Sequence, residues 1–316
     1  MGTPRNPVST SRWLSICALV MAYSIFVAAV PWDLVRAGGA GWNDRLVLLQ
    51  HFERSEYDHL YEGTWTDFIQ NNTPWYRAID YCASLLGGFD PALTLFSFVV
   101  SAIYAASVLG TSLRLLPLLF VPMQIDLFDT QIRSACAGAL LVAALKTDRV
   151  ALSIVLALLS VCMHNVAALL LGLWIAATLT ASVLRGSSAS GLKSLTATSV
   201  VTCGVITILS FISQTSANYS TNNNSGSVAA FCVAMSILGI VAAGRKGMDA
   251  QALFSFMVLL LVAAGSPLEL GLQRLLPLTM PVIAASFLRF PAPYPLIAGA
   301  LCLVAQIYWT ARWVVW

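Results

Sequence analysis

Charged residues are scarce in this chain of 316 residues, of which only 10% are Asp, Glu, Lys or Arg and 58% are hydrophobic. Soluble domains carry about 25% charged residues, so this balance excludes an ordinary soluble fold. The net charge of +3 at neutral pH comes from scattered basic residues, and no nucleic-acid partner is expected. The composition indicates an integral membrane protein.

Paired cysteines and nucleotide-binding motifs are also missing. The seven cysteines stand singly, without a CxxC motif or a Cys/His set with the spacing of metal ligands, so neither a zinc site nor a disulfide framework is expected. The chain has no P-loop, HExxH helix, GxSxG elbow or GxGxxG turn. These absences disfavour an ATP-driven pump, an intramembrane metalloprotease and a nucleotide-binding enzyme, and we expect neither a metal nor a cofactor.

Long apolar segments alternate with short polar connections along the whole chain. They lie near residues 13–31, 91–110, 112–127, 131–146, 149–163, 166–184, 194–213, 227–244, 251–266, 271–289 and 293–312. We predict an all-α polytopic protein with about eleven transmembrane helices, residues 1–316 forming a single transmembrane domain. Segments within 112–146 and 149–184 that fall short of about 20 residues are predicted to be short, tilted or broken helices.

The distribution of charge predicts an orientation. A cytoplasmic N-terminus followed by alternating spans places ten of the seventeen basic residues on the cytoplasmic side, as the positive-inside rule requires. Of the acidic residues, only Asp148 and Asp249 fall on that side. The acidic residues therefore gather on the outer face, together with the two long polar connections.

Those two connections have different characters. Residues 32–80 are predicted to form an outer amphipathic segment, because apolar and charged residues in its middle recur at helical spacing. Residues 213–227 are rich in Ser and Asn and are predicted to form an outer flexible loop.

Polar residues at the outer ends of the spans are the candidates for a site. They are Asp126, Asp129, Gln131, Arg133, His164, Asn165, Glu269, Gln273 and Arg274. Ionisable groups within spans are costly and by default face a bundle interior or a wet cavity. Alternatively, Arg133 and Arg274 reach the lipid headgroups, His164 is a packing residue, and Asp126 and Asp129 cap the helix beginning at about 130.

The outer segment adds further charges and aromatic rings. Its charged candidates are Asp44, Arg45 and Arg77, and its aromatic candidates are Trp42, Trp65 and Trp75. A tryptophan near the outer membrane surface belongs either to an interfacial aromatic belt or to a surface on which sugar rings stack.

Three blocks of this sequence resemble motifs of the EpsG-like family of bacterial exopolysaccharide and O-antigen polymerases, of the Wzy type. In that family a Pro-x-Tyr-Arg stretch precedes a span, Gln-x-Arg-x-Ala opens a later helix, and a short basic turn leads to a helix ending in His. The corresponding residues here are Pro74, Tyr76 and Arg77, then Gln131, Arg133 and Ala135, then His164. Thr73 stands where the family usually has Glu.

The resemblance implies a GT-C-like helical bundle in the bacterial inner membrane, with its active site facing the periplasm. Such a polymerase transfers a growing glycan from one undecaprenyl diphosphate to the non-reducing end of another lipid-linked repeat unit. The implied partners are undecaprenyl-diphosphate-linked oligosaccharide, membrane lipid and a chain-length-regulating membrane protein.

The chemistry of this transfer suggests roles for the candidates. Arg133 and Arg274, helped by Arg45 or Arg77, are expected to bind the donor diphosphate and stabilise the charge that grows on the leaving group. His164 is the preferred base for the acceptor hydroxyl, because a histidine has a reference pKa of about 6.5. Asp126 and Asp44 are the alternatives.

Three other functions use similar residues. A flippase or transporter of an anionic lipid-linked glycan would bind through the same arginines without chemistry. A glycan ligase would transfer the finished glycan to a different acceptor. An O-acyltransferase with His164 as base is a weaker alternative, because the sequence shows neither an Asp paired with His164 nor a cytoplasmic donor site.

Overall fold

The computed structural model describes residues 10–30, 73–129, 131–147, 149–164, 166–185, 225–243, 249–265 and 275–315. Every regular element within these ranges is a helix, which confirms the predicted all-α class. Three helices have the length and apolar composition of membrane spans, namely Ser11–Ala29, Phe89–Thr111 and Val166–Val183. The prediction of about eleven spans is neither confirmed nor excluded by this observation.

The chain divides into two compact units, Met1–Asn165 and Val166–Trp316. Of the described helices, the first unit contains α1 and α5 to α10, and the second contains α11 and α13 to α16. The single transmembrane domain expected over residues 1–316 stays a prediction.

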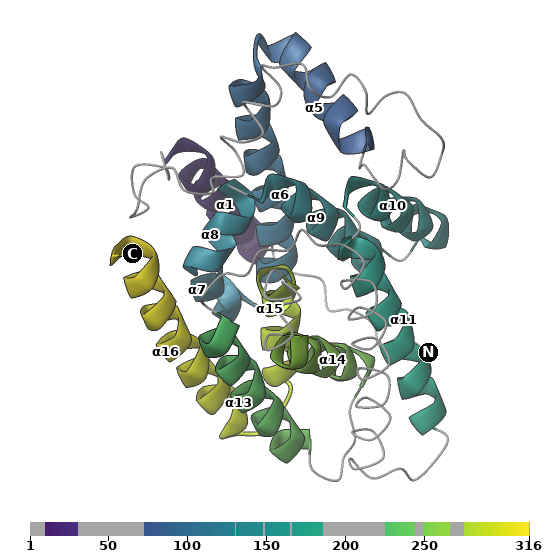
Figure 1. The fold of residues 1–316 in the computed structure, drawn as a ribbon, viewed down its shortest axis with the longest axis vertical. Helices are drawn as coiled ribbons and strands as arrows, with labels where there is room; N and C mark the ends of the chain where they lie inside the picture. The colour runs from purple at the N-terminus through teal and green to yellow at the C-terminus, as the bar shows by residue number, and fades with distance from the viewer. Residues whose placement is uncertain are drawn as a thin grey trace. The chain divides into compact units, whose positions relative to one another are not determined.

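Helix α6 (Phe89–Thr111) is the centre of the first unit. It packs against α1 (Thr10–Ala29), α5 (Thr73–Leu86) and α9 (Ile132–Lys146), as Figure 1 shows. The chain turns sharply between α5 and α6 at Gly87, whose φ of 78° suits a residue without a side chain.

The expected span at 112–127 is a broken helix. It consists of a 3₁₀ turn at Leu113–Leu115, then α7 (Leu116–Leu119), then α8 (Pro122–Asp129). Pro117 and Pro122 stand at the starts of α7 and α8, where the missing N–H of proline is tolerated although it interrupts a continuous helix.

Hydroxyl groups from neighbouring helices bind the backbone of this broken segment. Tyr23 Oη of α1 donates to the carbonyl of Leu119, 2.8 Å away, and Ser97 Oγ of α6 donates to the carbonyl of Phe128, also 2.8 Å away. Interrupted helices within a bilayer need such partners, because lipid offers none. These two bonds hold α7 and α8 against α1 and α6.

Helices α9 and α10 (Val150–Met163) form an antiparallel hairpin. Ser153 Oγ donates to the carbonyl of Ala144 at 2.8 Å, and Ser160 Oγ donates to the carbonyl of Ala137 at 2.6 Å. The helices have 15 and 14 residues, so each is only about 22 Å long, which is shorter than a hydrocarbon core of about 30 Å. Both are short, as predicted from the length of their apolar segments.

Helix α14 (Ala250–Gly265) is the buried centre of the second unit. It packs against α11 (Val166–Arg185), α13 (Ser225–Ala243) and α15 (Leu275–Phe287), and α16 (Tyr294–Val315) packs against α13 and α15. Figure 1 shows α16 and α13 running side by side.

Polar contacts join α14 to α15. The hydroxyls of Ser255 and Ser286 are 2.8 Å apart within this buried interface. At the exposed end, Arg289 Nη1 donates to Asp249 Oδ2 at 2.7 Å, so the start of α14 and the end of α15 lie at the same end of the unit. Alternating spans require this arrangement; the side of the membrane on which this end lies stays a prediction.

Two expectations about helix ends are corrected. Asp129 does not cap the helix that follows it, because Asp129 is the last residue of α8 and Gln131 is the N-cap residue of α9. The loop expected over 213–227 ends earlier, because α13 begins at Ser225, and the rest of that loop lies outside the described residues.

Candidate functional site

Two neighbouring residues of α6 fix the positions of α5 and α8. Phe96 packs against the ring of Trp75 from α5, with ring centroids 5.3 Å apart, and Ser97 binds the carbonyl of Phe128 in the last turn of α8. Ser97 follows Phe89, the first residue of α6, by eight residues, or about 12 Å along the helix. The end of α8 therefore lies beside the interior of α6 and not beside its end.

The junction between α8 and α9 lies at this depth. It contains Asp129 and Gln131 and leads into Arg133 in the first turn of α9. Helix α5 runs back from the start of α6 toward α10 and packs against both (Figure 1). Arg133, which follows this junction, is thus held among helices, which is where ionisable groups within spans usually mark a site.

Arg133 is the cation at this junction. Its side chain is half-buried, and its Nη1 donates to Tyr76 Oη of α5 at 3.0 Å. It forms no ion pair with any carboxylate in the part of the chain that the structure describes. A half-buried guanidinium that meets no carboxylate among the described side chains is able to bind an anion.

The register of the α9–α10 hairpin places His164 opposite Arg133. The hydrogen-bonded pairs Ser153–Ala144 and Ser160–Ala137 are two turns apart on each helix. Because the two helices are antiparallel, both pairs fit a single register. One turn beyond the second pair, this register aligns His164 with Arg133. His164 is half-buried, its backbone N–H donates to the carbonyl of Ser160 at 3.1 Å, and its extended conformation ends α10.

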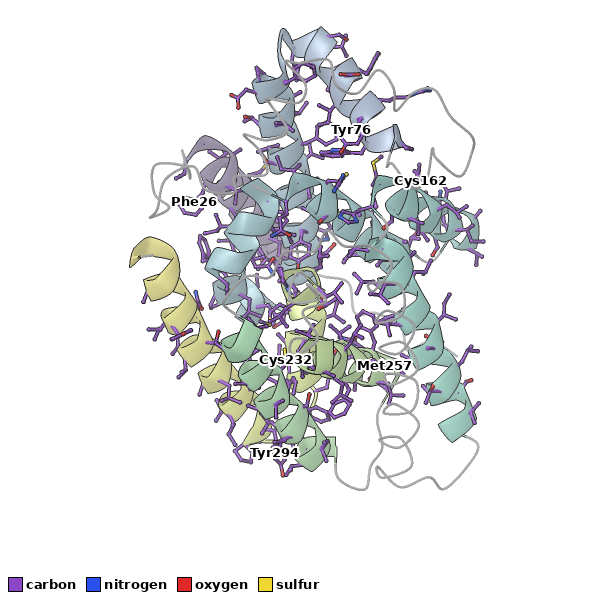
Figure 2. The ribbon with its side chains drawn as sticks, viewed as in Figure 1. Phe26, Tyr76, Cys162, Cys232, Met257 and Tyr294 are labelled. Carbon is purple, nitrogen blue, oxygen red and sulfur yellow. The ribbon has the colours of Figure 1, made fainter. Side chains whose placement is uncertain are left out.

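Figure 2 shows Tyr76 and Cys162 in the region where α5 meets α10. Cys162 lies in the last turn of α10, just before His164. Helix α10 packs against both α5 and α9, Tyr76 of α5 binds Arg133 of α9, and α10 ends just before His164. The arrangement can bind an anion beside a group able to take up a proton.

Trp75 does not have the exposed ring that a glycan-stacking residue needs. Its side chain is fully buried, at 0% exposure, and it packs with Phe96 in an edge-to-face geometry. Its Nε1–H has no hydrogen-bond partner among the described residues. The expectation that Trp75 binds glycan is therefore corrected to a packing role between α5 and α6.

The other expected site residues are described only in part. Arg77 is exposed on α5, and the backbone of Asp126 belongs to α8, while its side chain is outside the description. The remaining candidates, which lie outside the described residues, are Asp44, Arg45, Trp42, Trp65 and Arg274. The structure thus places Arg133 and His164 at corresponding levels of the α9–α10 hairpin, and Arg274 lies outside the described residues.

Tyr76 is the residue of this site whose role is not predicted from the sequence. It belongs to a motif, but its contact with Arg133 joins residues 57 positions apart. An available signal was the amphipathic pattern of 73–86, which places Trp75, Tyr76 and Ile79 on one buried face.

No group of three or more His, Cys, Asp or Glu side chains forms a candidate metal site within the described ranges. Comparison of the chain with protein-family models, with curated proteins and with solved structures gives no match. The motif resemblance to the EpsG-like polymerases therefore stays a prediction.

Proposed function

We propose that this protein is a membrane glycosyltransferase that polymerises undecaprenyl-diphosphate-linked oligosaccharide repeat units on the periplasmic face of a bacterial inner membrane. The observation that supports this proposal most is the hydrogen bond between two motif residues, with a third motif residue aligned by the hairpin register. Tyr76 and Arg133 are hydrogen bonded, and the hairpin register aligns His164 with Arg133. All three belong to the sequence blocks that resemble the polymerase family.

In the proposed reaction, Arg133 binds the diphosphate of the donor lipid. The acceptor hydroxyl attacks the anomeric carbon of the donor glycan, and the bond from that carbon to the diphosphate oxygen breaks. The hydroxyl proton passes to His164, and undecaprenyl diphosphate leaves with the bonding electron pair. A guanidinium suits this role because it stays charged in apolar surroundings and forms paired hydrogen bonds with phosphate oxygens.

The depth of the junction also supports a lipid-linked donor. A diphosphate attached to a polyprenyl chain reaches the protein from the bilayer, whereas a nucleotide sugar arrives from water. Ser97, which binds the carbonyl of Phe128, lies about 12 Å along α6 from its first residue, and Phe96 beside it packs against Trp75, the neighbour of the Arg133 partner Tyr76. The remaining proposed diphosphate ligands are Arg274, Arg45 and Arg77.

The test is an in vitro polymerisation assay with purified protein and the lipid-linked repeat unit isolated from the producing bacterium after deletion of this gene. Arg133→Ala should lower the rate about 100- to 1,000-fold, because it removes a group that stabilises the leaving charge. His164→Ala should lower it about 100-fold or more through loss of the base. Arg149→Ala, at the exposed start of α10, is the matched control and should retain activity.

Glycan ladders should lengthen with time for the wild-type protein and for the Arg149 variant. The proposed function is wrong if the wild-type protein binds its substrate but never elongates it. That result would favour the flippase or transporter. Normal ladders from folded Arg133 and His164 variants would instead overturn the site assignment.

A further inference from the structure

Tyr76 holds one edge of the guanidinium that the proposed function assigns to the donor diphosphate. Its side chain is only 8% exposed, and its Oη accepts the hydrogen bond from Arg133 Nη1 at 3.0 Å. An arginine presents five N–H groups in one plane. When Nη1 is engaged with the phenol, the Nε and Nη2 groups remain together as a fork that matches two phosphate oxygens.

Helix α5 is fixed where Tyr76 lies. The preceding residue, Trp75, is fully buried against Phe96 of α6, and Ile79, on the same face one turn further, is also fully buried. A shift of Tyr76 along with the side chain of Arg133 would therefore disturb this packing and cost free energy. An unsupported arginine side chain has many rotamers, and ordering them upon binding costs free energy.

We propose that Tyr76 is a positioning residue that preorganises Arg133 for a diphosphate, so that the free fork of the guanidinium is aimed before the ligand arrives. This inference rests on the proposed function, because it takes the lipid diphosphate as the ligand of Arg133. Tyr76 acts through Arg133, so its effect on diphosphate binding requires a planar guanidinium at position 133.

Tyr76→Phe is the direct test, because it keeps the buried ring and removes the hydrogen-bond acceptor. We expect it to raise the Kd of purified protein for undecaprenyl diphosphate about 10-fold and to lower kcat/KM by a similar factor. Tyr81→Phe is the matched control, because Tyr81 is on the same helix and is 67% exposed. This control should leave both values unchanged.

A double-mutant cycle separates positioning from a merely structural role. Lysine cannot present a planar fork, so Tyr76→Phe should change the Kd less than about twofold when added to Arg133→Lys. The thermal unfolding temperature of the single variant Tyr76→Phe should match that of the Tyr81→Phe control. Equal effects of Tyr76→Phe in both backgrounds, or wild-type affinity in the single variant, would overturn the inference.

The two proposals fail in different ways. Binding of undecaprenyl diphosphate with the expected cycle, but without elongation of repeat units by the wild-type protein, overturns only the polymerase. Elongation with no coupling between Tyr76 and Arg133 overturns only the positioning role. Absence of diphosphate binding by the wild-type protein overturns both.

Discussion

The indole of Trp75 shows how one side chain can suit several roles in a sequence and only one in a fold. Near a membrane surface, a tryptophan is typical of an interfacial belt and is also able to stack on a sugar. In the fold, the side chain is fully buried and its ring meets the ring of Phe96 from α6. Its buried surface joins α5 to α6 and thereby places Tyr76 beside Arg133.

At the residue scale, we predict that Trp75→Ala destabilises the protein by about 3–5 kcal/mol, because a large buried side chain leaves a cavity. Thermal unfolding in detergent checks this prediction. Trp13→Ala, at an exposed position of α1, is the control and should change the stability by less than about 0.5 kcal/mol. A variant of Trp75 with wild-type stability but weaker glycan binding would restore the stacking role.

At the element scale, the register of the α9–α10 hairpin determines which residues of α9 lie opposite which residues of α10. Its serine hydroxyls bind carbonyls of the opposite helix, and this register aligns His164 with Arg133. A shift of one turn would move the histidine by about 5.4 Å and separate the proposed base from the diphosphate ligand. The small residues of α9 allow the close approach that these bonds need.

The register predicts which introduced cysteines form a disulfide. With Cys136 and Cys162 replaced by alanine, Leu140→Cys should cross-link to Ala157→Cys, because these positions are level in the hairpin. Leu140→Cys should not cross-link to Ile154→Cys, since Ile154 is 55% exposed and lies about one turn away. Gel mobility under oxidising and reducing conditions measures both. Preferential cross-linking of the second pair would mean that His164 is not aligned with Arg133.

At the scale of the whole molecule, the proposed orientation assigns the start of α6 to the periplasm and the start of α14 to the cytoplasm. Asp90 lies in the first turn of α6, and Asp249 precedes α14 and pairs with Arg289. Both are exposed, and an exposed ion pair contributes at most about 1 kcal/mol, so replacing Asp249 should leave the fold intact.

We therefore predict opposite labelling of these two positions in a cysteine-free variant. In spheroplasts, a membrane-impermeant maleimide should label Asp90→Cys directly and Asp249→Cys only after the membrane is disrupted. The reverse pattern would invert the orientation and place the Arg133 site toward the cytoplasm. Labelling of both positions from outside would contradict the alternation of spans.

Hydropathy and proline positions are local properties, and the features that depend on them were predictable. Apolar segments near 91–110, 131–146 and 149–163 correspond to α6, α9 and α10 within a few residues. The interruption of the 112–127 segment follows from Pro117 and Pro122. The cap expected at Asp129 was wrong because α8 extends to that residue and the turn into α9 comes later.

The sequence by itself determined the helical membrane class, most helix bounds and the candidacy of Arg133 and His164, because these depend on composition and on spacing along the chain. Only the tertiary structure decided that Trp75 is buried, that Tyr76 binds Arg133, and that the register of the α9–α10 hairpin aligns His164 with Arg133. Those facts depend on how α5, α9 and α10 pack. Contacts between residues as far apart as 76 and 133 follow from the packing of whole helices, which no local pattern records.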